Sequence, residues 1–118
     1  MEAGRKNRRA AGSRYEEQAA AWLEQAGLQI LERNYRCRQG EIDLIALDGE
    51  TLVFVEVKYR SGLWAGSPEE AVDRRKQNRI RTVARYYLYQ KGLGEDLPCR
   101  FDVVGILGEQ IHWIRDAF

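Results

Sequence analysis

Residues 41–58 read EIDLIALDGETLVFVEVK, and this stretch decides the fold. Two apolar runs flank the dipeptide Asp48-Gly49, which is typical of a β-hairpin turn. The segment therefore predicts two antiparallel strands. Three charged side chains interrupt the apolar pattern, at Asp43, Glu56 and Lys58. Charged groups in such a hairpin usually have a partner or a chemical role.

The length of the turn sets which residues face each other across the hairpin. A two-residue or four-residue loop centred on Asp48-Gly49 would pair Glu41 with Glu56 and Asp43 with Phe54. A three-residue loop without a bulge would move Asp43 to the other face of the sheet. With the first register, one face carries four charged side chains: Glu41, Asp43, Glu56 and Lys58.

Carboxylates gathered in this way repel one another and have raised pKa values unless a cation lies between them. A site of oxygen ligands without His or Cys suits Mg²⁺ or Mn²⁺. A lysine beside such a cation suits phosphodiester hydrolysis, because both positive charges stabilise the charge that builds up on the phosphate. The alternative is a plain salt bridge between an acid and Lys58 across the hairpin. The residues by themselves leave both interpretations open.

The rest of the chain supplies two helices and three further strands. Residues 1–12 are expected to form a flexible basic arm, and residues 13–118 a single domain. Ser13 is expected to cap a helix that ends near Ala26, and a long helix should follow Ser67-Pro68 and end near Lys91. Further strands are expected at 28–36, 100–107 and 110–114. The order α-β-β-β-α-β-β, with the long helix as a right-handed crossover, predicts an α/β fold with a mixed sheet of about five strands.

Helical spacing brings side chains from both helices toward the sheet. Glu16 falls on the inward stripe of the first helix, where a capping glutamate and a functional glutamate would both be placed. Lys76 lies on the sheet-facing side of the second helix, one turn before Ile80. Trp22 and Trp113 are expected in the core and His112 at the surface.

Charge, cysteine content and hydropathy limit the kinds of partner and site that the protein can have. From residue 74 to residue 91 the chain has seven Lys or Arg and no Asp or Glu, which suits either a solvated helix face or a phosphate-binding surface. Two distant cysteines and one His argue against a zinc site. No apolar run is long enough for a bilayer, and the N-terminus lacks the apolar core of a signal peptide. A cytoplasmic protein that does not enter membranes is expected.

Four stretches resemble the YraN family of small bacterial proteins: GSRYEEQAAAWLEQAG (12–27), ERNYRCRQGEIDLIALDGETLVFVEVKYR (32–60), AVDRRKQNRI (71–80) and FDVV (101–104). The pattern of Asp43 followed by Glu56-Val57-Lys58 also resembles the PD-(D/E)xK nucleases of the restriction-endonuclease-like superfamily. In organisation it is similar to archaeal Holliday junction resolvases. The proline that names the motif is absent, since Ile42 precedes Asp43.

The resemblance implies a role for each matching residue. Asp43, Glu56 and the backbone carbonyl of Val57 would hold Mg²⁺ or Mn²⁺, Lys58 would position the attacking water, and Glu16 would hold a further water or metal. Residues expected to contact nucleic acid are Arg60, Arg74, Lys76 and Arg79, and accessory positions are Glu41, Trp64 and Gln77.

These features together predict a metal-dependent endonuclease that acts on DNA, with branched or structured DNA favoured over a particular sequence. Trp64, in a glycine-containing loop, would either stack on a base or pack against its own domain. Cutting both strands of a junction would need two sites, and therefore a homodimer. The alternative is a non-catalytic nucleic-acid-binding or protein-adaptor module that keeps the nuclease fold.

Overall fold

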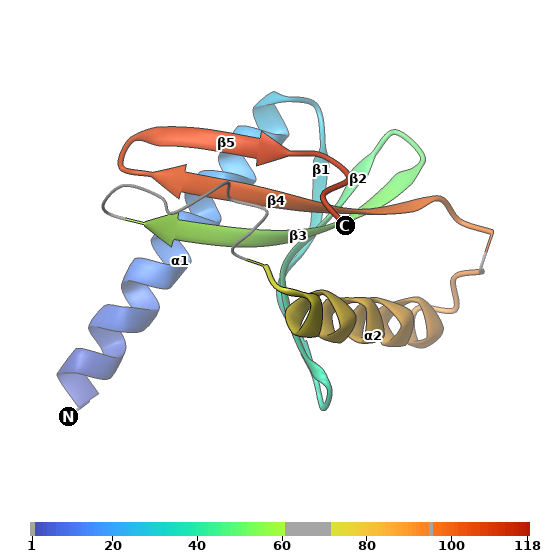
Figure 1. Cartoon of the computed structure of the whole chain (residues 1–118), viewed down its shortest axis with the longest axis horizontal. Coiled ribbons are helices and arrows are strands. Elements are labelled where there is room, and N and C mark those ends of the chain that lie inside the picture. The colour runs from blue at the N-terminus through green and yellow to red at the C-terminus, as the bar shows by residue number, and fades with distance from the viewer. Residues whose placement is uncertain (1, 61–71, 95) are drawn as a thin grey trace.

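The computed structural model describes residues 2–60, 72–94 and 96–118 (Figure 1). Its elements follow the order α1 (Glu2–Gln25), β1 (Gln29–Cys37), β2 (Gly40–Asp48), β3 (Thr51–Arg60), α2 (Arg74–Gln90), β4 (Cys99–Leu107) and β5 (Gln110–Ile114). The predicted order α-β-β-β-α-β-β and the α/β class are confirmed.

The five strands form one mixed sheet in the order β1-β2-β3-β4-β5. β3 and β4 are parallel, and the other neighbours are antiparallel. Parallel neighbours need a crossover, which α2 supplies between β3 and β4. Figure 1 shows α1 and α2 on opposite sides of the sheet.

Each helix covers its own apolar core. The core under α1 takes its helical residues from the end of that helix and its sheet residues from alternating positions on β2, β3 and β4; it includes Ala19, Ala20, Leu23, Leu44, Ala46, Val53, Val55, Val104 and Ile106. The core under α2 uses the opposite positions; it includes Ile42, Ile45, Leu52, Phe54, Ile80, Val83, Ala84, Tyr87 and Val103. The strands between the two helices are therefore apolar on both faces.

The hairpin register differs from the predicted one. Asp48 pairs with Thr51, so the loop is Gly49-Glu50, and Ile45 rather than Asp43 lies opposite Phe54. Gly49 takes a positive φ of 63°, which favours glycine in the first position of a two-residue turn. The shift is two residues, so the side chains of the paired segment, Leu44 to Asp48 and Thr51 to Val55, keep their predicted faces.

The ladder between β2 and β3 ends at the pair Leu44–Val55. Beyond this pair the alternation of side chains along β2 is broken. Ile42 packs under α2 and Leu44 packs under α1, although regular alternation would put both on the same face. On the neighbouring strand, Asn34 has a φ of 54°, an irregularity in β1 next to the same point. The two strands therefore separate just before Glu56.

Both helices begin elsewhere than expected. α1 starts at Glu2, so Ser13 lies within the helix and its predicted role as cap is wrong. The first dozen residues are mostly good helix formers, which explains the extension; the flexibility of this arm stays a prediction. α2 starts at Arg74, because Asp73 is its N-cap and accepts a 2.9 Å hydrogen bond from the Lys76 amide. The expected start after Ser67-Pro68 is therefore wrong, and residues 61–71 lie outside the described part.

Two predictions about aromatic residues have different outcomes. Trp22 is 43% exposed, so its expected place in the core is wrong, whereas Trp113 is half-buried and packs against the core under α1. His112 is exposed, as expected. In the described residues, no helix is both long enough and apolar enough to span a bilayer.

Candidate active site

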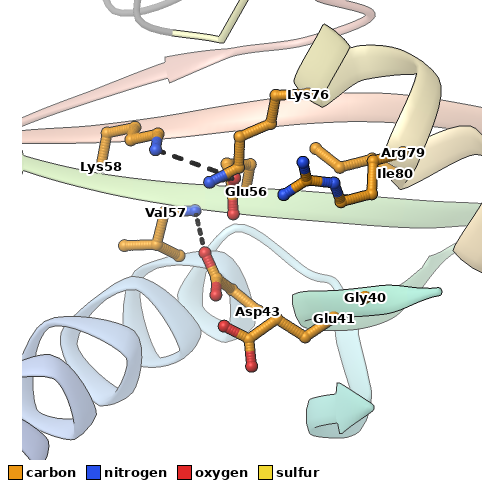
Figure 2. A pocket seen from close by; sticks show the side chains of 9 residues that line it. All are labelled: Gly40, Glu41, Asp43, Glu56, Val57, Lys58, Lys76, Arg79 and Ile80. Atoms are coloured by element: carbon orange, nitrogen blue, oxygen red, sulfur yellow. Dashed lines mark hydrogen bonds and ion pairs between the residues drawn. The ribbon is translucent and has the colours of Figure 1, made fainter. Parts of the chain in front are cut away.

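A pocket of about 270 Å³ opens where β2 separates from β3, on the side covered by α2 (Figure 2). We call it the Asp43 pocket. Its lining comes from β2, β3 and α2 and consists of Gly40, Glu41, Asp43, Glu56, Val57, Lys58, Lys76, Arg79 and Ile80. Five predicted site residues of the hairpin, together with Lys76 and Arg79, are thus brought to one place.

The end of the β2–β3 ladder gives Asp43 its position. Val57 lies past the last pair, and its amide donates a 2.8 Å hydrogen bond to Asp43 Oδ2 instead of to a backbone carbonyl. In an extended strand the N–H and C=O of one residue point to the same edge. The Val57 carbonyl therefore faces the same gap as the Asp43 carboxylate.

Asp43 and Glu56 lie side by side, and each carboxyl shifts the pKa of the other. Burial and then the hydrogen bond with Glu56 raise the pKa of Asp43 to about 9. For Glu56, burial alone would raise the pKa, but the hydrogen bond from Asp43 and the interaction with Lys76 together lower it. Protonated Asp43 therefore donates to ionised Glu56, which is how two adjacent buried carboxyls avoid repulsion when no cation lies between them.

Two lysines approach Glu56 from different elements (Figure 2). Lys76 Nζ of α2 lies 2.8 Å from Glu56 Oε2, and Lys58 Nζ of β3 lies 3.9 Å from the same oxygen. Burial, followed by the proximity of Lys76, lowers the pKa of Lys58. Burial also opposes the charge of Lys76, but Glu56 outweighs it and raises the Lys76 pKa. The Glu56 carboxylate is the centre of this network.

These oxygens fit a small divalent cation. Glu56 Oε2 is buried, and the hydrogen-bond geometry of its contact with Lys76 is poor, so no described group donates a well-aligned hydrogen bond to it. Two carboxylates and one carbonyl are hard ligands, and Mg²⁺ or Mn²⁺ completes such a partial set with water. Within the described ranges, no three acidic, His or Cys side chains gather as a metal-binding group. Protein side chains would therefore supply a minority of the ligands.

Glu16 reaches the region from α1. It is half-buried, and burial is the main cause of its raised pKa, which a hydrogen bond from Asn34 partly offsets. The negative charges of Glu41 and Glu56 raise it further, and Glu16 in turn raises the pKa of Asp43. Glu16 does not line the pocket, but its charge acts on the carboxylates that do.

The remaining predicted residues are spread around the pocket. Glu41 lines it but is exposed, and its carboxylate accepts a 3.1 Å hydrogen bond from Arg36. Arg74 is exposed and Arg60 donates to the Tyr59 carbonyl at 3.1 Å; neither is part of the lining.

Gln77 also points elsewhere, because its amide donates to the Val72 carbonyl at 2.9 Å. Trp64 belongs to the stretch outside the described residues.

Sequence reasoning missed three contributors: Asn34, Gly40 and Ile80. Asn34 had a signal, since Asn is one of few residues that tolerate positive φ within a strand. Gly40, with φ 148°, lets the Arg79 side chain pack against its backbone, because an added Cβ would lie 3.1 Å from Arg79 Cδ. Ile80 is an ordinary apolar helix residue, and nothing in the sequence marks it as pocket lining.

Residues 15–106 match the family described as "Uncharacterised protein family UPF0102". A UPF0102 protein of Lachnoclostridium phytofermentans is 52% identical over 112 residues, which cover 95% of each chain. One from Aeromonas hydrophila is 50% identical over 108 residues, covering 91% of this chain and 83% of the relative. One from Pseudomonas syringae is 42% identical over 123 residues, covering 97% and 96%. The chain belongs to the UPF0102 family, the YraN-like group that its sequence motifs resemble.

Proposed function

We propose that the Asp43 pocket hydrolyses phosphodiester bonds of nucleic acid, with DNA as the substrate and Mg²⁺ or Mn²⁺ as the cofactor. The carrying observation is the pair of adjacent carboxyls, Asp43 and Glu56, with Lys58 3.9 Å from one of them. The proposal includes membership of the PD-(D/E)xK superfamily, to which the Asp43 and Glu56-Val57-Lys58 pattern is similar. A nucleic-acid substrate would place the protein in the cytoplasm.

Each residue of the pocket has a definite task in this proposal. Asp43, Glu56 and the Val57 carbonyl would hold the cation, which when bound supplies positive charge against the phosphate and activates water. Asp43 would lose its proton, because a cation between the two carboxylates stabilises their ionised forms and lowers the raised pKa of Asp43. Lys58, beside the two carboxylates, would donate a hydrogen bond to the phosphate oxygen that gains negative charge. Lys76 would give up its ion pair with Glu56 and pair with the phosphate instead.

The surroundings favour recognition of shape over recognition of sequence. The cationic groups beside the carboxylates, Lys58, Lys76 and Arg79, suit contacts with phosphates, which fix position but carry no sequence information. Branched or structured DNA would then be selected by its backbone geometry. If both strands of a junction are cut, two pockets are needed, and a homodimer would supply them.

The test is cleavage of a labelled panel that contains a four-way junction, a flap, a single strand, a duplex and a structured RNA, with Mn²⁺ or Mg²⁺. Wild type should cut at least one DNA, and both Glu56→Gln and Lys58→Met should lower the rate at least about a hundredfold. Glu41→Gln is the matched control, since Glu41 lines the pocket but is exposed and paired with Arg36. Cutting that survives both site variants would come from a contaminant, and absence of cutting with every metal would remove the proposal.

A second candidate is a binding module without catalysis, and the 2.8 Å pair between Lys76 and Glu56 favours it. In that case the lysines neutralise the buried acid permanently and no cation enters. The two candidates differ in the response to metal. Under the nuclease proposal, Mn²⁺ at a hundred times its Kd should stabilise wild type by about 2.7 kcal/mol, and Asp43→Asn should abolish the effect. Thermal melts with EDTA and with Mn²⁺ measure it, and an unchanged midpoint would support the binding module.

A further inference from the structure

The surface of α2 that faces away from the sheet is basic and free of acids. The helix reads RRKQNRIRTVARYYLYQ and contains no Asp or Glu. Within the described residues, Arg74, Arg75 and Arg85 are exposed on this surface, and Arg79 is exposed at its edge, beside the Asp43 pocket. No ion pair or ring contact holds the guanidinium groups of these four described residues. Unpaired cations along one helix are available to an anionic partner.

At the C-terminal end of α2, this surface carries large apolar side chains that are exposed. Tyr89 is 83% exposed, Tyr86 38% and Leu93 40%. A second pocket, of about 260 Å³, lies beside them, and we call it the Tyr89 pocket; its lining is Arg85, Leu88, Tyr89, Leu93 and Gly94. Exposed apolar side chains that gather in one patch mark a candidate contact surface.

The lining of the Tyr89 pocket suits a flat, apolar group that carries an anion. The Tyr89 ring offers a face for stacking, the leucines offer apolar walls, and Arg85 can contact a phosphate. An apolar protein segment would use the walls but leave the guanidinium of Arg85 unmatched. An unpaired nucleobase with its phosphate uses both. A base inside a duplex presents no free face, so the pocket would select unpaired nucleotides.

The two pockets lie along one helix. Arg79 lines the Asp43 pocket and Tyr89 lines the other, ten residues further along α2, in Figure 1 the gold helix beside β2 and β3. Ten helical residues rise about 15 Å along the axis but make about 2.8 turns, so the two pockets open on different flanks of α2 and a strand that joins them crosses the outer face of the helix. At roughly 3.4 Å per nucleotide of a stacked strand, the axial rise alone takes about four nucleotides, and crossing the helix takes more.

We propose that the Tyr89 pocket binds an unpaired nucleobase at least about four nucleotides from the phosphate in the Asp43 pocket, while the arginines of α2 hold the backbone between them. This rests on the proposed function, and it deepens that function by naming single-stranded or frayed nucleic acid as the substrate class. The base contact is sequence-tolerant, because every base has a face that stacks.

The test measures binding in EDTA, so that no cleavage is required. A labelled single strand of twelve nucleotides and the blunt duplex of the same length are titrated by fluorescence anisotropy at several salt concentrations. Tyr89→Ala should weaken binding of the single strand roughly tenfold and leave the duplex within about twofold. Tyr89→Phe keeps the ring and should restore the affinity. Arg85→Gln should lower the salt slope by about 0.7.

Arg115→Gln is the matched control for charge, because Arg115 stacks on Trp113 at 4.1 Å instead of lying on α2. Its affinity should equal that of wild type. Equal affinity of Tyr89→Ala and wild type for the single strand would overturn the inference, and so would an equal loss for single strand and duplex. If sedimentation shows wild-type dimers that Tyr89→Ala dissociates, without any effect on the strand, the pocket binds a second copy and the inference fails.

The inference and the nuclease proposal fail separately. A Tyr89-dependent affinity together with no cleavage in Mn²⁺ would remove only the catalytic proposal. If cleavage depends on Glu56 but the affinity for the single strand is the same with and without the Tyr89 ring, only the base-binding inference fails. Because Tyr89 is almost fully exposed, its variants should keep the wild-type fold, which circular dichroism checks.

Discussion

The Val57 amide donates a 2.8 Å hydrogen bond to the Asp43 carboxylate just past the last residue pair of the β2–β3 ladder. A side chain thus takes the place of a backbone acceptor. This contact locks Asp43 to the backbone of β3, one residue from Glu56. The two carboxyl groups are therefore adjacent because β2 and β3 separate at this point. Substitution of either acid should change the stability of the protein as well as its activity.

Asp43→Asn should stabilise the metal-free protein at neutral and alkaline pH. Burial, and then Glu56, raise the pKa of Asp43 to about 9 in the folded state, against about 3.9 when unfolded. Between these values the folded protein holds a proton that the unfolded chain has released. The stabilisation is therefore complete below about pH 4 and is lost as the pH rises toward 9, by at most about 1.4 kcal/mol per pH unit. Asparagine removes this loss and can still accept from Val57.

Urea unfolding in EDTA at acidic, neutral and alkaline pH measures this effect. The free-energy difference between Asp43→Asn and wild type should grow as the pH increases. Glu41→Gln, which changes an exposed acid of the same pocket, is the control. A constant difference for Asp43→Asn would show that Asp43 is ionised in the folded protein.

Lys76→Met should destabilise the metal-free protein by about 1 to 2 kcal/mol, because it leaves the buried Glu56 carboxylate without its closest cation. The magnitude is kept low because the Lys76 side chain is 38% exposed and solvent screens the pair. Denaturant melts at neutral pH measure it. Arg75→Met, on the outer face of the same helix, is the control and should cost less than about 0.5 kcal/mol.

The same pair can be isolated in a double-mutant cycle. Adding Glu56→Gln to Lys76→Met should recover part of the lost stability, since the uncompensated charge is then gone. Strictly additive effects of the two substitutions would mean that the pair contributes no coupling energy.

Gly40→Ala should cost more stability than Gly49→Ala. Both glycines have a positive φ, 148° and 63°, so both variants carry backbone strain. At Gly49 a new Cβ would meet no atom within 4 Å, whereas at Gly40 it would lie 3.1 Å from Arg79 Cδ. The expected excess is about 1 kcal/mol, together with weaker nucleic-acid binding as Arg79 is displaced. Thermal melts and anisotropy measure the two effects, and equal costs would show that Arg79 yields freely.

Asp102→Asn should destabilise the protein strongly without touching the chemistry of the pocket. Asp102 is fully buried on β4 and accepts hydrogen bonds from Arg100, Trp113 and the amide of Asp116, at 2.9 to 3.0 Å for the shortest contact of each. Losing the charge that matches Arg100 should cost about 3 kcal/mol. Asp116→Asn, an exposed position with φ 53° that suits asparagine, is the control.

Stability of the Asp102 variant is measured by denaturant melts, and activity is normalised to the folded fraction. Normalised activity should equal that of wild type. A selective loss of activity would connect Asp102 to the site instead of to the scaffold.

The hairpin shows how far pattern reasoning reaches. Asp43, Glu56 and Lys58 line one pocket, as alternation predicted, because a shift of two residues preserves parity within the paired ladder. The pairing itself was wrong by two residues. Two registers that differ by two residues bury the same side chains, so the hydrophobic pattern could not separate them. The positive φ available to Gly49 as the first residue of a two-residue turn decided the register.

Helix boundaries and the place of Trp22 failed for a different reason. A Pro with acids after it predicted the start of α2, but Asp73 provides a cap whose side chain accepts from the Lys76 amide. Trp22 was expected in the core, yet α1 packs on the sheet through Ala19, Ala20 and Leu23, and Trp22 stays 43% exposed. Competing caps and helix rotation are settled by the packing of the complete domain.

The sequence by itself determined the order of the elements, the crossover between β3 and β4, and the acids and lysine that share one face. These depend on local periodicity, turn residues and chain connectivity, all of which are readable within short segments. Only the tertiary structure decided that β2 leaves β3 before Glu56, that Lys76 pairs with Glu56, and that Glu16 acts on Asp43 from the opposite helix. Those relationships join residues far apart in the chain, and their distances follow from how two helices pack on a twisted sheet.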